Sequence, residues 1–342
     1  WYGAEEKLAT FEDNTGHEDT PAYRKAAGLW ISQWLTDARP EYTEEGIVRE
    51  ADPSVLRVLP TAPKDARNEG IDRSFIPAAA VPRITSLAQW KQRGAVLRNA
   101  LSSRMLRGLA SRDTPFATRK TRVQNWTERY AEGWNVQFDT EPALTVSGQL
   151  FLPKSPARAQ SALIYLKGAD DLVYGIDYDD ILSILPEHAV LVLRPRCVEY
   201  GMTNPEMAET KMSAALLGTT LETLQLHDVL RAVDFLIDGE KLPITSLSVY
   251  GRKAMGMVAI YAGAMDSRIT RVVLDRPPES HWDGPAVMHA LRHTDIPEVA
   301  ALIAPREVVF LGRVPSAYGL VETVAKLHPG GKPVREAVSL GD

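Results

Sequence analysis

The chain has a single cysteine, Cys197, among its 342 residues, so an internal disulfide and a cysteine-based metal site are both excluded. Positive charge is not in surplus either: 39 lysines and arginines face 44 aspartates and glutamates, for a formal net charge of -5. Such a balance, without long blocks of like charge, argues against nucleic acid and anionic membranes as partners.

No apolar run approaches the roughly 18 residues of a membrane span. Residues 1–30 lack the order of basic, apolar and small residues that marks a signal peptide. With 44% apolar and 24% charged residues, the composition indicates a globular, soluble chain with a substantial core. Because residue 1 is a tryptophan, we expect the sequence to begin downstream of the true start, which leaves the compartment open.

The N-terminal part predicts one clear helix and a connector. Large apolar residues, among them Trp30 and Trp34, recur at helical spacing over residues 21–38. From about 40 to 82 the composition shifts to scattered proline and charged residues, which predicts an extended connector with one strand-like run at 55–59.

After about residue 119, predicted strands alternate with predicted helices. The runs 134–138 and 145–152 flank a turn-like segment at 139–142 and predict an antiparallel hairpin. Six short apolar runs are typical of buried parallel strands: 162–166, 190–193, 247–250, 271–274, 308–311 and 333–338. Helices are expected at 86–110, 221–237, 255–264 and 316–327. This alternation predicts an α/β fold, a doubly wound, mostly parallel sheet with helices on both faces and an N-terminal helical accessory region.

One turn stands out as a place for chemistry. The predicted strand 247–250 leads into Gly251-Arg252-Lys253-Ala254-Met255-Gly256 and then an alanine-rich helix. In doubly wound sheets the ligand lies at the carboxyl ends of the strands. The nucleophile elbow of α/β-hydrolases has this strand, tight turn and helix, with a serine at the turn and an adjacent backbone N–H that binds the oxyanion.

Three segments resemble bacterial α/β-hydrolases of the acetyl xylan esterase-like and dienelactone hydrolase-like kind. They are LETLQLHDVLRAVDFL at 221–236, the turn at 251–256 with YAGAMDSRITRVVLD after it, and DIPEVAALIAPR at 295–306. The resemblance covers about residues 120–342. It implies an esterase without metal or cofactor that acts on acylated polysaccharide, outside the cell or in the periplasm.

The resemblance places the serine of the family at Lys253. A protonated lysine cannot attack an ester as an alkoxide does, so we expect the nucleophile to be lost. Two other roles stay open for Lys253, as a cation that binds an anionic ligand or as a Schiff-base nucleophile. Oxyanion or ligand-binding positions are expected at Gly168 and Ala254, and Arg252 and Arg313, which also follow strands, would make the cleft cationic.

The acid and the histidine of the triad are also missing from their expected places. The turn Gly312-Arg313-Val314-Pro315, where the family carries its acid, has no carboxylate. Asp275 is a substitute, although a helix cap or a partner for Arg276 is the plainer interpretation. The histidine should follow the strand 333–338, and the sequence stops at Asp342. Three departures together predict loss of the whole triad, because each member contributes little without the others.

The N-terminal segment resembles the end of an α/β-hydrolase: a last strand at 7–11, a histidine loop around His17 and a closing helix. Two interpretations follow. In a tandem protein, residues 1–38 would be the tail of a preceding hydrolase module, 39–119 a connector and helical region, and 120–342 the α/β-hydrolase-like domain. In a permuted protein, His17 would complete the site of this same domain.

Two other groups of residues have a weaker claim to chemistry. His281, His289, His293 and Asp295 suggest a metal site, because His289 and His293 lie four residues apart and would share one helix face, but a zinc site would need two more well-placed ligands. Cys197 follows the strand 190–193, where Arg194 and Arg196 would activate its thiol if they pointed at it.

Two hypotheses of function result. The first is a degenerate esterase module that supports a neighbouring hydrolase module or binds an ester, carbohydrate or other ligand. The second is an active carboxylesterase or acetyl xylan esterase whose site is completed by His17 or by a nucleophile that the sequence does not reveal.

Overall fold

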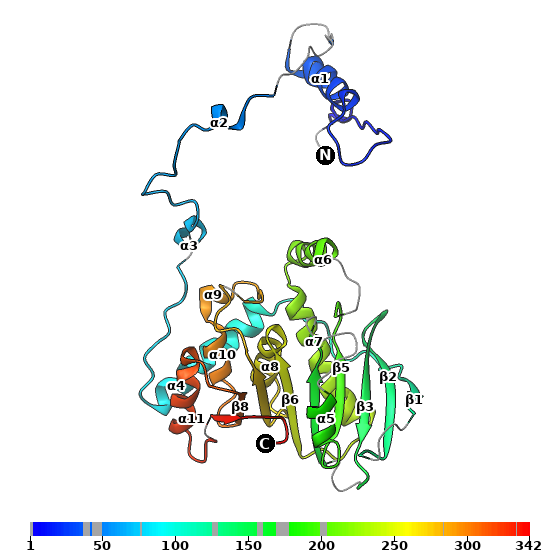
Figure 1. Cartoon of the computed structure of the whole chain (residues 1–342), viewed down its shortest axis with the longest axis vertical. Coiled ribbons are helices and arrows are strands. Elements are labelled where there is room, and N and C mark those ends of the chain that lie inside the picture. The colour runs from blue at the N-terminus through cyan, green and yellow to red at the C-terminus, as the bar shows by residue number, and fades with distance from the viewer. Residues whose placement is uncertain are drawn as a thin grey trace. The chain divides into compact units, whose positions relative to one another are not determined.

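The computed structural model describes residues 3–36, 42, 50–75, 77–124, 129–155, 160–168, 178–198, 204–282, 284–332 and 334–342. The chain divides into two compact units, Trp1–Glu69 and Gly70–Asp342. Figure 1 shows the elements of both units along the chain.

The first unit contains the predicted helix, α1 (Pro21–Leu35), whose N-terminus is capped by the Thr20 hydroxyl, which accepts from the Tyr23 N–H at 3.3 Å. The strand predicted at 7–11 is wrong: a 3₁₀ turn, η1 (Glu5–Lys7), is followed by irregular backbone. No strand is present among the described residues of this unit to pair with it, and a strand is not stable without a ladder partner.

The strand-like run predicted at 55–59 is also corrected. Its first residues belong to the short helix α2 (Pro53–Leu56), because the Asp52 carboxylate accepts from the Ser54 N–H at 2.8 Å and Pro53 is placed in the first turn. Local capping therefore decides the conformation here over the β propensity of two valines.

The second unit begins with α3 (Ile71–Phe75) and α4 (Leu87–Ala100), which continues as the π-helical turn η2 (Leu101–Met105). Trp90 and Leu97 of α4 are buried in the core of this unit. Part of the segment that we predicted as a connector and helical region thus packs against the α/β domain.

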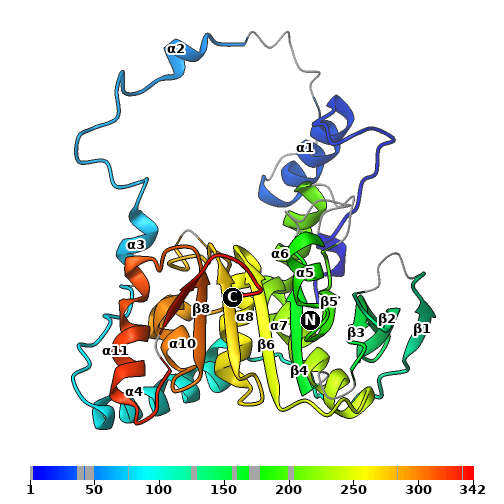
Figure 2. The ribbon, with the colours of Figure 1, turned by 60° about the horizontal axis from the view of Figure 1, so that its bottom comes forward.

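A nine-stranded sheet forms the centre of the second unit, in the order β1-β2-β3-β5-β4-β6-β7-β8-β9. The first three strands and the β3–β5 pair are antiparallel, and the remaining pairs are parallel. Figure 2 shows the strands running from β8 through β6 and β4 to the hairpin. The bounds are β1 (Arg119–Arg122), β2 (Glu132–Glu141), β3 (Leu144–Leu152), β4 (Ser161–Leu166), β5 (Ala189–Arg194), β6 (Ser246–Arg252), β7 (Arg271–Asp275), β8 (Glu307–Leu311) and β9 (Arg335–Ala337).

Helices cover both faces of the sheet, as predicted for a doubly wound fold. A large apolar cluster packs α4, α7, α8, α10 and α11 against one face, and a smaller one packs α5 against the other. None of the described helices has the length and apolarity needed to cross a lipid bilayer. The helix bounds are α5 (Tyr178–Ile184), α6 (Asn204–Leu216), α7 (Leu221–Asp234), α8 (Ala254–Met265), α9 (Ala290–His293), α10 (Ile296–Ala301) and α11 (Gly319–Leu327), with short turns at η4 (Phe235–Gly239) and η5 (Ser316–Tyr318).

Two details of the strand predictions differ. The hairpin strands run further than predicted, so that Glu141 pairs with Leu144 and the turn is Pro142-Ala143. The last strand is shorter than the predicted 333–338, and Pro333 lies outside the described residues.

Candidate functional site

The turn between β6 and α8 is held in one conformation by glycines. A Cβ atom at Gly251 would lie 2.1 Å from the carbonyl oxygen of Met255, so no larger residue fits there. The Lys253 N–H donates to the Asp275 carbonyl at 2.9 Å, and the Gly256 N–H donates to the Lys253 carbonyl at 2.8 Å. The chain thus reverses sharply from a buried strand into a buried helix.

Lys253 occupies the apex of this turn in a left-handed conformation, with φ 49° and ψ -122°. A non-glycine residue in such a region costs about 1–3 kcal/mol, and residues of this kind cluster at functional sites. The side chains of Lys253 and Ala254 are exposed. The predicted strand, tight turn and helix are therefore present, with a lysine at the position that is strained.

A cavity of about 180 Å³ opens beside this turn. It brings together the predicted oxyanion or ligand-binding positions Gly168, Arg252 and Ala254 with Lys253. The N-terminus of α8 adds backbone N–H groups and the positive end of the helix dipole. The remaining lining residues come from the end of β5 and from α6, α7 and the start of α8: Cys197, Val198, Met207, Lys211, Leu221, Glu222, Gln225 and Met255.

The charge of the cavity is mixed but leans positive. Lys211 and Glu222 form an ion pair with 3.4 Å between Nζ and Oε1. Arg252 and Lys253 add two positive side chains at the turn itself. The lining can thus bind a small polar group, and its apolar part consists of side chains such as Val198, Met207 and Leu221.

Asp275 lies at the end of β7, next to the turn, and its carboxylate is engaged by two guanidinium groups. Its oxygens lie 3.2 Å from Arg252 Nε and 3.1 Å from Arg276 Nε, and the Tyr250 hydroxyl donates to it at 3.4 Å. These contacts agree with the interpretation of Asp275 as a partner for Arg276. They also tie Arg252 to the strand edge.

The predicted acid turn after β8 receives a carboxylate from another strand. Gly312 has φ 93° and no carboxylate follows it in the turn. The Val314 N–H instead donates to Glu336 Oε1 at 3.0 Å, from β9. Sequence reasoning missed Glu336, because a single glutamate in a short strand carries no motif. Arg313 is exposed and is not among the residues that line the Lys253 cavity.

His17 belongs to the first unit, in an exposed loop before α1. The Thr15 hydroxyl donates to Glu18 across this loop at 3.3 Å. A role of His17 in the Lys253 site stays a prediction.

Cys197 lines the Lys253 cavity, but Arg196 points elsewhere. The Arg196 guanidinium makes ion pairs with Asp228 at 2.6 Å and Glu141 at 2.5 Å. The Asp228 side chain is 0% exposed, and the Gln225 amide donates to the Arg196 carbonyl at 3.0 Å. The charge of Arg196 therefore neutralises the Asp228 and Glu141 carboxylates.

In the loop that contains His281 and Asp295, these two side chains make hydrogen bonds within the protein. His281 Nδ1 lies 2.6 Å from the Pro285 carbonyl oxygen, and its Nε2 lies 2.8 Å from the Tyr261 hydroxyl. A carbonyl can only accept, so Nδ1 carries the proton and Nε2 accepts from the tyrosine. Burial lowers the pKa of His281. Asp295 accepts from the Ile296 N–H at 2.8 Å and caps α10. Within the described ranges, no three histidine, cysteine, aspartate or glutamate side chains gather as a metal site.

Comparison with known proteins defines the class of this fold. No protein-family model and no curated protein sequence matches the chain. A candidate acetyl xylan esterase from Bacteroides fragilis superposes with a TM-score of 0.61 at 12% identity, over 81% of this chain and 83% of that one. A glucuronoyl esterase from Solibacter usitatus superposes with a TM-score of 0.51 at 15% identity, over 78% of this chain and 95% of that one.

The second unit therefore has the α/β-hydrolase fold. Its structural neighbours are carbohydrate esterases, which confirms the predicted resemblance at the level of the fold. At these identities a shared fold does not by itself assign an activity.

Proposed function

We propose that the α/β unit is a non-catalytic, ligand-binding module of a carbohydrate-esterase-like protein, in which the Lys253 turn binds an anionic group. The observation that carries this proposal is the conformation of Lys253, which holds the strained apex of the turn. A lysine there keeps the geometry that presents a side chain to a ligand but replaces an attacking hydroxyl by a positive charge.

The surroundings of the turn support binding over ester hydrolysis. Asp275 is paired with two arginines, and the acid turn after β8 holds no carboxylate of its own. A general base has to lie within hydrogen-bond reach of the group that it activates. No histidine is present among the described residues that line the cavity.

The ligand class follows from the charges. Lys253 and the N-terminus of α8, with Arg252 and its partner Asp275 beside them, line one side of a cavity of about 180 Å³, which suits a carboxylate on a single sugar ring better than a neutral ester. One structural neighbour is a glucuronoyl esterase, and the hydrolysis of a glucuronoyl ester releases a sugar carboxylate. We propose D-glucuronate as the ligand to test, and support of a neighbouring hydrolase module as the biological role.

Isothermal titration of the full chain with D-glucuronate and with its methyl ester tests the proposal. The acid should bind about tenfold more tightly than the ester, because a charge-assisted hydrogen bond contributes about 1.5–3 kcal/mol. Lys253→Met keeps the length of the side chain without its charge and should remove this preference. Lys91→Met, at an exposed position on α4, should retain it. Equal binding of acid and ester by the unmodified chain would contradict the proposal.

We keep as a second function an active carboxylesterase completed by His17, whose side chain is exposed in the loop before α1. It predicts release of p-nitrophenol from its acetate ester that His17→Ala abolishes while the thermal unfolding of the α/β unit stays unchanged. Absence of turnover in the unmodified chain would rule this function out.

A further inference from the structure

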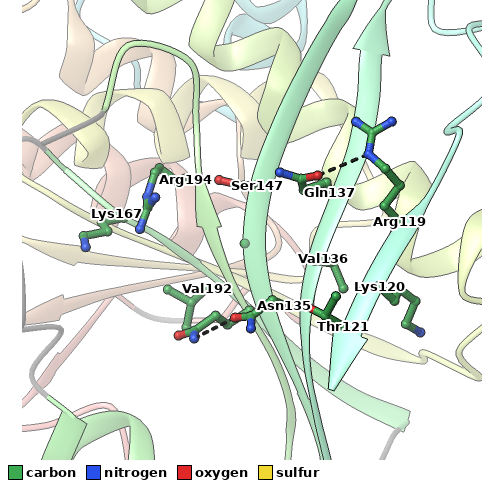
Figure 3. Close-up of a pocket in the computed structure, with 12 residues that line it drawn as sticks. Arg119, Lys120, Thr121, Asn135, Val136, Gln137, Ser147, Lys167, Val192 and Arg194 are labelled. Atoms are coloured by element: carbon green, nitrogen blue, oxygen red, sulfur yellow. Dashed lines mark hydrogen bonds between the residues drawn. The ribbon is translucent and has the colours of Figure 1, made fainter. Parts of the chain in front are cut away.

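A row of polar side chains crosses the sheet in register, away from the Lys253 turn. Arg119 of β1 pairs with Gln137 of β2, Gln137 with Ser147 of β3, and Ser147 with Arg194 of β5. Lys167, which follows β4, lies beside Arg194 (Figure 3). Because directly paired residues in a sheet project from the same face, these five side chains share one surface.

A second row lies next to the first on the same face. Thr121 pairs with Asn135, Asn135 with Gln149, and Gln149 with Val192. The Gln149 amide donates to Asn135 Oδ1 at 3.0 Å. The two rows line a groove of about 510 Å³, which we call the Arg194 groove.

The Arg194 groove is rich in positive charge, and neutral groups hold one of its arginines, Arg119, in place. The Arg119 guanidinium donates to Gln137 at 3.1 Å and to Thr145 at 3.2 Å, both uncharged partners. The Arg194 side chain is exposed and makes no hydrogen bond or ion pair with any other residue that the structure describes. Lys167 adds a third cation at the same end as Arg194.

Two other charged side chains near the groove, Lys120 and Asp139, have partners within the protein. Lys120 also lines it, but its ammonium is paired with Glu240 at 2.6 Å, so it does not enter the argument. Asp139 lies further along the same face and accepts from the Thr145 hydroxyl at 2.6 Å. No carboxylate is present among the described residues that line the groove.

From this arrangement we infer that the Arg194 groove binds a carboxylated oligosaccharide. Guanidinium groups bind carboxylates through two parallel hydrogen bonds, and the side-chain amides and hydroxyls offer both donors and acceptors to sugar hydroxyls. From β1 to β5 the row crosses three strand spacings, about 14 Å, which is longer than one sugar ring. The cations at its two ends therefore suit carboxylates on different sugar units.

The lining also disfavours nucleic acid, the other common polyanion. Proteins that bind single strands stack the bases on aromatic side chains. No aromatic residue is among the described residues that line the groove. The inference is independent of the proposed function, because it concerns other residues and a longer ligand.

Isothermal titration of the full chain with tetragalacturonate tests the inference. The control ligand is the same tetrasaccharide with its carboxylates reduced to alcohols. Arg194→Gln and Arg119→Gln should each weaken binding of the acid about tenfold, and the reduced ligand should bind at least tenfold more weakly than the acid. Arg122→Gln removes the same charge from the same strand, at an exposed position that pairs with Trp134. It should change binding by less than twofold.

Three results would overturn the inference: no binding of tetragalacturonate, an equal loss in Arg122→Gln, or binding of a single-stranded oligonucleotide as tight as that of the acid with the same dependence on Arg194. Titration with D-glucuronate separates this site from the cavity at the turn, which Arg194 does not line. Arg194→Gln should leave binding of that monosaccharide unchanged while it weakens binding of the tetrasaccharide. Circular dichroism and thermal unfolding show whether each variant is folded.

Discussion

The Lys253 cavity and the Arg194 groove belong to one sheet but are built in different ways. The cavity depends on backbone geometry: a glycine that admits no Cβ, a strained lysine and the start of a buried helix. The groove depends on side chains that strand pairing brings into register. Changes to the backbone of the turn at the cavity should therefore affect folding, whereas changes in the groove should affect binding alone.

The largest expected effect is a difference in the free energy of unfolding between variants of Arg196 and Arg194, which lie two positions apart. Arg196→Ala should lower the free energy of unfolding by about 3–5 kcal/mol, because it leaves the buried Asp228 carboxylate without its partner. Arg194→Ala should change it by less than about 0.5 kcal/mol, as expected for an exposed side chain. Urea unfolding of both variants measures the difference, and equal stabilities would contradict the structural role of the Arg196–Asp228 ion pair.

A comparable pair of glycine variants tests the backbone of the turn. Gly251→Ala should destabilise the chain by about 3 kcal/mol, since its Cβ would lie 2.1 Å from the Met255 carbonyl oxygen. Gly319→Ala is the matched control, because nothing lies within 4 Å of a Cβ there. It should be neutral or slightly stabilising. A Gly251→Ala variant that unfolds at the same urea concentration as the unmodified chain would disprove the tight turn.

Strain at Lys253 predicts a smaller effect of opposite sign. Lys253→Gly should stabilise the chain by about 1 kcal/mol, because glycine adopts φ 49° without the cost that a side chain carries. Lys253→Ala retains the strain and should not stabilise. Differential scanning calorimetry of the two variants measures this, and stabilisation by alanine alone would contradict the explanation.

The smallest effect concerns pH. Burial lowers the pKa of His281, so the unfolded chain takes up a proton below about pH 6.5 while the folded chain does not. The stability that the neutral ring contributes is complete above that pH and is lost as the pH falls toward the lowered pKa. His281→Asn should make the melting temperature fall less between pH 7.5 and 5.5. His289→Asn, at an exposed position, should not change that slope.

Much of the α/β unit could be predicted from the sequence, because its signals are local. Apolar runs mark the buried strands, and the glycines on either side of Lys253 mark the turn. The N-terminal strand at 7–11 was predicted wrongly, because a resemblance to a last strand cannot show that a partner strand is present. The helix at Pro53–Leu56 was missed because capping by Asp52 outweighs β propensity.

The groove could not be predicted in the same way. Gln137 and Gln149 look like the solvent side of an ordinary hairpin, and nothing local places Arg194 in register with Ser147, 47 residues away in the chain. The signal that was available is the alternation of polar residues in both hairpin strands next to an arginine that ends a buried strand. Glu336 at the acid turn was missed for a related reason, since it comes from β9 and not from the turn itself.

The most direct test of the central claim, that the Lys253 turn binds and does not catalyse, is exposure of the purified chain to a fluorophosphonate probe with p-nitrophenyl acetate turnover measured in parallel. We predict no covalent adduct by intact-protein mass spectrometry and no release of p-nitrophenol above the rate in buffer. A stoichiometric adduct, or turnover that Lys253→Ala abolishes, would contradict the account.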